Sequence, residues 1–300
     1  MIPYSRQLIS EEDIKFVNKV LRSDYLTTGP IVDEFEKLLV EKFKCQYSTV
    51  VNSATSALHV SCLAMGLSNK DTLWTVPNTF VATANCAIYC GAKVDFVDID
   101  ESTSLISINE LKKKLEIAKK FNKLPKILIP VHLSGQPTLQ EEIYKLSLDY
   151  GFKIIEDASH SVGGSRNNQP VGNCKWSHAT IFSFHPVKII TSGEGGSIMS
   201  NDEDFDRKCK MIRSNGITKD KKYFTHNEKG PWYYEQQSLG YNYKLSDIHS
   251  ALGLSQLNRL NEFIKERNRI ANIYNAELKD LPIHLPKIID GNKSSYHLYI

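Results

Sequence analysis

Lys188 is the side chain of this sequence with the clearest chemical potential. It lies between apolar neighbours in the segment HPVKIITSGEGG, residues 185–196. A lysine in such a segment ordinarily extends its ammonium group to water. A desolvated lysine instead has a lowered pKa and can act as a nucleophile and general base, which a Schiff-base enzyme requires. The glycines that follow match neither a Walker A loop nor a GxGxxG fingerprint, which argues against the ordinary nucleotide triphosphatases and dehydrogenases.

A second reactive corner contains Asp157 and His160, directly after the apolar run 153–156. A carboxylate at the end of a buried strand needs a partner, because an unpaired buried charge is costly. Capping of the next loop would explain the aspartate equally well. The two side chains could also be metal ligands, but His132 is the only candidate for a third ligand, and its spacing is unconvincing. We therefore predict no metal site.

The third corner is the segment NSATSAL, residues 52–58, in which small and hydroxyl residues join a predicted strand to a predicted helix. Free N–H groups at a helix N-terminus favour a phosphate. A capping turn without any ligand would use the same residues. Taken together, the three corners supply a phosphate cradle, a carboxylate and a lysine, and a cofactor that would use all three is pyridoxal 5'-phosphate.

The elements that must position these corners alternate along the chain between short β-branched or aromatic runs and helical patterns. This alternation is typical of an α/β fold with a mostly parallel sheet covered by helices, whose ligands bind at the carboxyl ends of the strands. The predicted strands are 49–51, 73–76, 94–97, 126–131, 153–156, 180–184 and 197–200. The predicted helices between them are 56–65, 83–89, 109–121, 139–150 and 202–212.

The two ends of the chain carry further signals. Ser10 with the three acidic residues after it resembles a capping box, and Pro30 suits the start of a second helix. Residues 223–243 are predicted to form a long loop, residues 246–278 a long helix or a broken pair, and a strand is expected to begin at Tyr296. We expect a large domain over residues 1–245, and a smaller C-terminal α+β domain that begins with residues 246–300 and is incomplete here.

Composition sets wider limits. The 300 residues are 41% hydrophobic and 24% charged, which excludes collagen-like and wholly disordered proteins. A net charge of +3 gives little support for binding to nucleic acid or a membrane surface. Six cysteines are too few for a disulfide scaffold in a chain of this length, and no apolar run is long enough to span a bilayer. The expected location is the cytoplasm.

Five segments of this sequence resemble those of the DegT/DnrJ/EryC1/StrS sugar aminotransferases, which are pyridoxal phosphate enzymes of fold type I. Within that family, the similarity is greatest to the transaminases of pseudaminic acid biosynthesis. It covers the chain from Leu26 to its end. The segments are LWTVPNTFVATANC (73–86), IEDASH (155–160), SFHPVKIITSGEGG (183–196), GPWYYE (230–235) and ALGLSQL (251–257).

The resemblance implies roles for particular residues. Lys188 would form the Schiff base with the cofactor and act as the catalytic base. Asp157 would keep the pyridine nitrogen protonated, His160 would approach the ring hydroxyl, and Phe80 would stack on the ring, although a core aromatic is the alternative for Phe80. The phosphate would be held by Ala54, Thr55 and Ser183, and by Asn242 of a second subunit in a homodimer whose active sites are shared. The implied sugar-nucleotide contacts are Tyr4, Leu26, Thr27, Thr28, Gly29, His185, Tyr296, His297, Leu298 and Tyr299.

The implied reaction moves an amino group from L-glutamate, which leaves as 2-oxoglutarate, to the C4 keto group of a UDP-linked 4-keto-6-deoxy-N-acetylhexosamine. One alternative is a sugar dehydratase of the same fold, although those enzymes resemble sequences with histidine in place of the lysine. Another is a non-catalytic regulatory relative, which would fit a chain of only 300 residues. Because family members extend beyond the point that matches Ile300, we expect this chain to be truncated.

Overall fold

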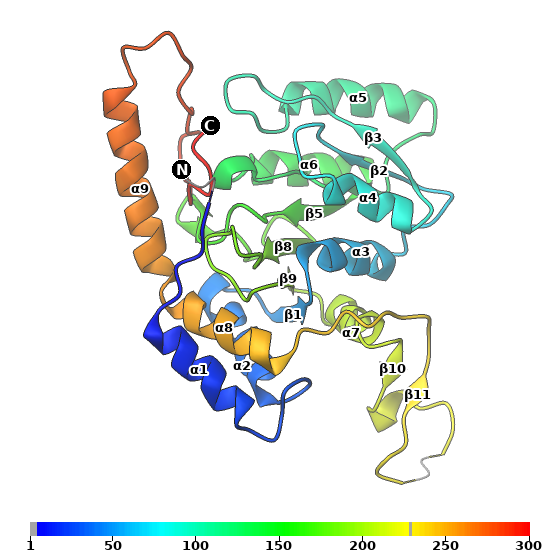
Figure 1. Ribbon diagram of the computed structural model, residues 1–300. Coiled ribbons are helices and arrows are strands. Elements are labelled where there is room, and N and C mark those ends of the chain that lie inside the picture. The colour runs from blue at the N-terminus through cyan, green and yellow to red at the C-terminus, as the bar shows by residue number, and fades with distance from the viewer. Residues whose placement is uncertain (1–4, 228–229) are drawn as a thin grey trace.

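The computed structural model describes residues 5–227 and 230–300 and is built around one seven-stranded sheet (Figure 1). The strand order is β1-β9-β8-β5-β4-β2-β3. Only β9 runs antiparallel to its neighbours, so the predicted mostly parallel sheet is confirmed. The strands are β1 (Tyr47–Val51), β2 (Thr72–Thr75), β3 (Lys93–Phe96), β4 (Ile127–Leu128), β5 (Lys153–Asp157), β8 (Ala179–Ser183) and β9 (Gly196–Ser200).

Every predicted strand of this sheet is present, but β4 is shorter than expected. The sequence predicts a strand over 126–131, whereas β4 ends at Leu128. Pro130 has no N–H to donate, which limits regular pairing beyond this point. The carbonyl of Pro130 instead accepts a hydrogen bond from Asp157 N at 3.0 Å, so the segment after β4 stays attached to the end of β5.

Helices cover both faces of the sheet, and alternating residues of each strand face the two layers. Ile155 packs with α3, α4 and α7, which lie on one face, and Ile154 packs with α5 and α6 on the other. A third core cluster joins α2, α8 and α9 to that second face. The bounds are α2 (Pro30–Phe43), α3 (Ala54–Ala64), α4 (Ala82–Tyr89), α5 (Ile108–Lys120), α6 (Gln140–Tyr150), α7 (Glu203–Ile212), α8 (Asp247–Asn258) and α9 (Leu260–Glu277).

The first helix, α1 (Glu11–Leu21), begins with the predicted capping box, in which Ser10 and Asp13 exchange hydrogen bonds. Asp13 is fully buried and also binds Ser255 and Gln256 of α8. The predicted helical stretch 246–278 is a broken pair, since α8 ends before Arg259 and α9 starts at Leu260. The predicted domain boundary at residue 245 stays a prediction.

Two sequence predictions near the C-terminal half need correction. The predicted loop 223–243 contains the strand β11 (Glu235–Gln236), which pairs with β10 (Ile217–Thr218). The strand expected at Tyr296 is absent. The last described strand is β12 (Asn292–Lys293), which pairs with β6 (Ser165–Arg166) and, through it, with β7 (Gln169–Pro170).

The chain cannot continue as a strand after β12 because Tyr296 takes a left-handed conformation, with φ of 44°. The guanidinium of Arg267 donates to the carbonyls of Tyr296 and His297 at 3.0 and 3.2 Å. These contacts fold the last residues back toward the carboxyl end of the sheet. Throughout residues 5–227 and 230–300, every helix is too short or too polar to cross a membrane.

Candidate active site

A cavity of about 440 Å³ opens beside the carboxyl ends of β5 and β8 and the N-terminus of α3. This is where a sheet of this kind is expected to bind ligands. The cavity brings together residues from both halves of the sequence and contains most of the residues predicted to touch the cofactor. The predicted residues that line it are Ala54, Thr55, Phe80, Asp157, His160, Ser183, His185, Lys188 and His297.

One end of the cavity is suited to an anion. Ser53 caps α3 by accepting a hydrogen bond from Ser56 N, and the N–H groups of Ala54 and Thr55 have no partner within the helix. The hydroxyl of Ser183, at the end of β8, lies on the same cavity wall. A Cβ at Gly196 would come within 2.6 Å of Ala54 N, so glycine is required for β9 to approach this turn. The partial positive charge of the helix end adds to the attraction for a phosphate.

The carboxylate of Asp157 lies at another wall and is 5% exposed. Its Oδ2 accepts a hydrogen bond from the Thr83 hydroxyl at 2.7 Å, and its Oδ1 accepts one from Ser159 N at 3.1 Å. Both donors are neutral. Within the described part of the chain, no basic side chain lies within ion-pair distance of this carboxylate. A buried carboxylate left in this state is suited to a positively charged ligand group.

Lys188 is half-buried and lies in a turn. Its backbone N–H donates to the carbonyl of His185 at 2.9 Å. Burial lowers the pKa of the Lys188 ammonium, and the negative charge of Asp157 opposes this shift only in part. The lysine therefore holds its proton less strongly than a surface lysine. The ring of Phe80 lines the same cavity and is 70% exposed, so a planar ligand can lie against it.

Two histidines close the cavity on the side of the C-terminal segment. The rings of His160 and His297 are packed with their centroids 4.4 Å apart. Burial, together with the charge of Lys188, lowers the pKa of His160 to about 4. Burial and the neighbouring His160, Lys188 and Arg267 lower the pKa of His297 to about 2. Both rings are therefore neutral near pH 7, and the Nδ1 atom of each is buried with no hydrogen-bond partner among the described residues.

The remaining predicted contacts lie outside the cavity lining. Leu26, Thr27, Thr28 and Gly29 precede α2, where Gly29 N donates to Asp247 at 2.7 Å. Tyr296 and Leu298 flank His297 without lining the cavity, and the Tyr299 hydroxyl donates to Asn275 at 2.6 Å. Asn242 pairs through its main chain with Ser214. Tyr4 lies outside the described residues.

Sequence reasoning missed the support of Asp157. Thr83 binds its carboxylate, and the Thr79 hydroxyl lies 2.8 Å from that of Thr83. Thr83 is in the first turn of α4, and Thr79 lies in the turn that precedes this helix. It also missed Glu194, whose carboxylate is 3.7 Å from His185 Nε2 at the cavity edge.

These features fit pyridoxal phosphate. The free N–H groups of α3 fit its phosphate, Asp157 fits its ring nitrogen, and the unpartnered His160 ring lies on the same cavity. Lys188 supplies an amine of lowered pKa for its aldehyde. No residue that lines the cavity conflicts with such a ligand.

Comparisons with known proteins give relatives of this chain in sequence and in fold. The profile of the DegT/DnrJ/EryC1/StrS aminotransferase family matches residues 7–300. The UDP-4-amino-4,6-dideoxy-N-acetyl-beta-L-altrosamine transaminase of Campylobacter jejuni subsp. jejuni serotype O:2 is 40% identical over 300 residues, which are 100% of this chain and 76% of that protein. Among solved structures, the Helicobacter pylori PseC aminotransferase of pseudaminic acid biosynthesis superposes with a TM-score of 0.87 at 32% identity, over 99% of this chain and 76% of that one. A putative sugar aminotransferase of Streptococcus pneumoniae in its PMP form gives a TM-score of 0.89 at 27% identity, over 100% and 78% of the two chains.

Proposed function

This chain belongs to the DegT/DnrJ/EryC1/StrS aminotransferase family, and we propose that it transfers the amino group of L-glutamate to the C4 keto group of a UDP-linked 4-keto-6-deoxy-N-acetylhexosamine in pseudaminic acid biosynthesis. Enzymes of this family depend on pyridoxal phosphate. The observation that carries the proposal is the convergence of Lys188, Asp157 and the N-terminus of α3 on one cavity.

Binding comes first in the mechanism. The N–H groups of Ala54 and Thr55 and the hydroxyl of Ser183 would hold the phosphate of the cofactor. Asp157, oriented by Thr83, would hold a proton on the ring nitrogen, and Phe80 would cover one face of the ring. The chemistry that pyridoxal phosphate would supply there is an electron sink, which favours loss of a proton from the carbon that bears the amino group.

Proton transfer is the task of Lys188. Its lowered pKa makes Nζ lose its proton more readily than the Nζ of a surface lysine, and a neutral amine can accept the proton that leaves the donor's α-carbon. The same Nζ, now protonated, can return a proton during the second half of the reaction. Nζ must accept a proton in one half of the reaction and return a proton in the other. A group whose pKa lies closer to neutrality serves both proton transfers better than a surface lysine does.

We include a homodimer in the proposal. Phe80, at the cavity, is followed by large side chains that are exposed in the single chain: Val81, Ile88, Tyr89 and Phe96, each between 42% and 57% exposed. A surface of this kind suits a subunit interface. Asn242 does not line its own cavity, as expected for a residue that completes the phosphate site of a second subunit.

Mixing two inactive variants tests the shared site. In dimers that combine Lys188→Ala chains with Asn242→Ala chains, one of the two cavities holds both native residues. We expect up to about one quarter of the wild-type sites to recover in a randomised mixture. If the mixture recovers no activity after the chains have exchanged, Asn242 does not act across the interface.

The sugar contacts are also part of the proposal. His185 and His297 line the cavity and are suited to contact the substrate. The segments 26–29 and 296–299, with Tyr4, are proposed for the parts of the sugar nucleotide beyond it. A panel of UDP-linked 4-keto sugars, with product masses as the readout and glutamate as donor, tests this substrate class. All six cysteines are free thiols, which suits the proposed cytoplasmic location.

The decisive test of the activity is Lys188→Arg. We expect the visible absorbance of the bound cofactor and all amino transfer to be lost together, while the melting temperature changes little. Lys42→Arg is a matched control, because Lys42 is another partly buried lysine whose pKa is lowered by burial but which lies on α2. Retained transfer by Lys188→Arg would refute the assignment.

A further inference from the structure

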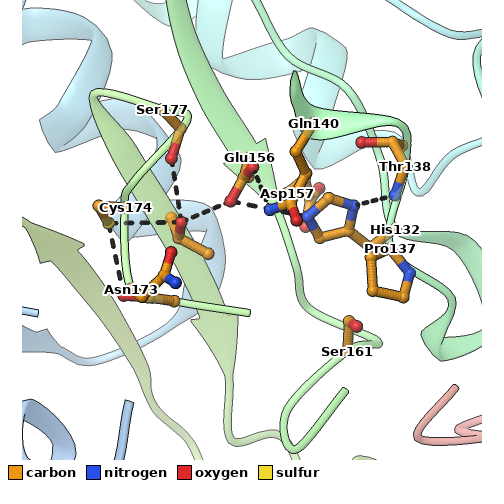
Figure 2. Close-up of polar contacts among 12 residues, drawn as sticks. His132, Pro137, Thr138, Gln140, Glu156, Asp157, Ser161, Asn173, Cys174 and Ser177 are labelled. Carbon is orange, nitrogen blue, oxygen red and sulfur yellow. Dashed lines mark hydrogen bonds and ion pairs between the residues drawn. The ribbon is translucent and has the colours of Figure 1, made fainter. Parts of the chain in front are cut away.

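Two buried carboxylates are adjacent at the end of β5 and point to opposite faces of the sheet. Asp157 binds Thr83 of α4 and lines the cavity, whereas Glu156 binds Gln140 of α6 on the other side, as Figure 2 shows for Glu156. Glu156 is 2% exposed and does not line the cavity. Neither the sequence motifs nor the proposed mechanism gives this second carboxylate a role.

The Glu156 carboxylate is held by two short hydrogen bonds from neutral side chains. The amide of Gln140, the first residue of α6, donates to Oε1 at 2.6 Å, and the hydroxyl of Thr180 on β8 donates to Oε2 at 2.7 Å. Sγ of Cys174 lies 3.5 Å from the Thr180 oxygen, and the Thr180 hydroxyl gives its proton to Glu156. Burial alone would raise the pKa of Glu156, but its contacts with His132, Thr180 and Gln140 hold that pKa below its ordinary value. Glu156 is therefore ionised near pH 7.

His132 faces the same carboxylate. Its Nδ1 accepts a hydrogen bond from Thr138 N at 3.1 Å, which leaves Nε2 as the ring nitrogen that can donate. That Nε2 lies 3.7 Å from Oε2 of Glu156. The Thr138 hydrogen bond fixes the orientation of the ring, and Nε2 faces the carboxylate at ion-pair distance, with no hydrogen-bond partner among the described residues (Figure 2).

The main chain at His132 supports the end of β5. His132 N donates to the carbonyl of Asp157 at 3.0 Å, and Asp157 N donates to the carbonyl of Pro130 at 3.0 Å. These two bonds fix the peptide groups on both sides of the Asp157 side chain. A displacement of His132 would therefore move the carboxylate that faces the cavity.

The same segment, residues 130–136, also supports the histidine side of the cavity. The carbonyl of Gly135 accepts from the hydroxyl of Ser161 and from Ser295 N, both at 3.0 Å. Leu298 N donates to the carbonyl of Ser134 at 3.3 Å. Ser161 follows His160, and residues 295 and 298 bracket His297. Hydrogen bonds from residues 130–136 thus hold the main chain at or beside three residues of the cavity wall, which are Asp157, His160 and His297.

We propose that Glu156 and His132 form a positioning pair, which acts from the face of the sheet opposite the cavity to fix Asp157 directly and His160 and His297 through residues 130–136. This inference rests on the proposed function for the role of Asp157. Stability alone is a weak reason to keep such a group, since apolar side chains often replace a buried charge without loss. A charge held by convergent donors, by contrast, gives each of them a single orientation.

Glu156→Gln is the first test. This variant removes the charge and keeps nearly the same volume. We expect kcat to fall about 10- to 100-fold, as small displacements of a reacting group do, with little change in KM for glutamate. We also expect a shift in the pH at which the absorbance of the bound cofactor changes, because Asp157 would hold the ring proton less well. Glu142→Gln is the control, since Glu142 lies exposed on α6.

A pair of His132 variants identifies which contact matters. Asparagine places an acceptor where Nδ1 was and cannot reach Glu156, whereas glutamine places a donor where Nε2 was. The proposal predicts that His132→Gln retains more of kcat and of the wild-type absorbance profile than His132→Asn. The opposite order would mean that the Thr138 contact, and not Glu156, orients this segment, which would overturn the pair.

A purely structural role would give a different pattern. In that case Glu156→Gln lowers the melting temperature, while kcat per folded molecule and the pH profile of the absorbance stay those of the wild type, and the positioning proposal fails. If Glu156→Gln does not fold, the order of the two His132 variants decides the question. Failure of the proposed function is distinguishable, because it would appear as activity that survives Lys188→Arg.

Discussion

At the end of β5, each face of the sheet holds one buried carboxylate, and the surroundings of the two carboxylates differ. On the cavity face, Asp157 has hydrogen bonds from Thr83 and Ser159 and no cationic partner among the described residues. On the opposite face, Glu156 is enclosed by Gln140, Thr180 and His132. A buried carboxylate is costly unless it is paired. Each carboxylate accepts two hydrogen bonds from neutral donors, but only Glu156 also has a histidine within ion-pair distance, whereas Asp157 faces the cavity and can bind a ligand.

The aromatic residues on the two faces of the sheet also differ in exposure. The rings of Phe35, Phe43, Phe182 and Phe184 are fully buried on the second face and pack in pairs. Phe80, by contrast, presents its ring to the cavity at 70% exposure. The face of the sheet that holds Glu156 therefore contributes packing to the stability of the fold, and the cavity face leaves an aromatic ring free to contact a ligand.

The largest expected effect is on stability, from a change on the second face. Phe182 packs against Phe43 with ring centroids 4.7 Å apart, and Phe182→Ala should lower the free energy of unfolding by about 3–5 kcal/mol. Urea denaturation measures this loss. At a temperature where the variant is folded, its kcat should stay within about twofold of the wild type, because Phe182 does not touch the cavity. A large loss of kcat in the folded variant would show that the two faces are not separable.

Asp157→Asn is the converse change, on the cavity face. The amide keeps the shape and loses the charge that holds the ring proton, so kcat should fall about 10²- to 10³-fold. The unfolding free energy of the cofactor-free protein should not fall, since no cation loses its partner. A steady-state assay and a thermal melt on the same preparation make the measurement. A wild-type kcat in Asp157→Asn would contradict the role of the Asp157 charge in the reaction.

Matched threonines give a smaller effect and a sharper contrast. Thr83 and Thr180 each donate to a buried carboxylate at 2.7 Å, on opposite faces. A hydrogen bond to a charged group contributes about 1.5–3 kcal/mol. Thr83→Val should therefore lower kcat about tenfold or more, with a modest change in melting temperature.

Thr180→Val should show the reverse balance. Its main effect should be on the free energy of unfolding, and its effect on kcat should be smaller than that of Thr83→Val, since it reaches Asp157 only through Glu156. Equal losses of kcat in the two variants would contradict the division between the faces.

The residues that sequence reasoning found are those whose chemistry is visible in local pattern. Lys188 and Asp157 each follow a run that reads as a buried strand, and parallel strands bring their carboxyl ends to one edge. The seven strands were predictable for the same reason, because their apolar runs are bounded by polar turns. The convergence of Lys188, Asp157 and the turn before α3 followed from that topology.

The supporting residues were not predictable, because their roles depend on partners far along the chain. Thr83 is 74 residues from Asp157, and Glu156 reads as one more residue of a strand until α6 and β8 are placed beside it. The strand predicted at Tyr296 was wrong for a similar reason. An aromatic run suits a strand, but the carbonyls of Tyr296 and His297 are bound by Arg267, 29 and 30 residues earlier.

The smallest effect concerns pH and the two histidines of the cavity face. The pKa of His160 in the folded chain is about 4, below the ordinary 6.5, because of burial and the charge of Lys188, with Asp157 opposing. As pH falls below 6.5, the unfolded chain takes up a proton before the folded one does. The stability due to a neutral His160 is therefore complete above about pH 6.5 and is lost toward pH 4, at up to about 1.4 kcal/mol per pH unit.

In His160→Gln, the unfolding free energy of the cofactor-free protein should therefore fall less steeply than that of the wild type between pH 7 and about 5, by roughly 1 kcal/mol per pH unit. His284→Gln, at an exposed position, is the control and should keep the wild-type slope. Carboxylates on both faces titrate in all three proteins, so the difference in slope isolates the cavity, and identical slopes would mean that His160 carries a proton in the folded state.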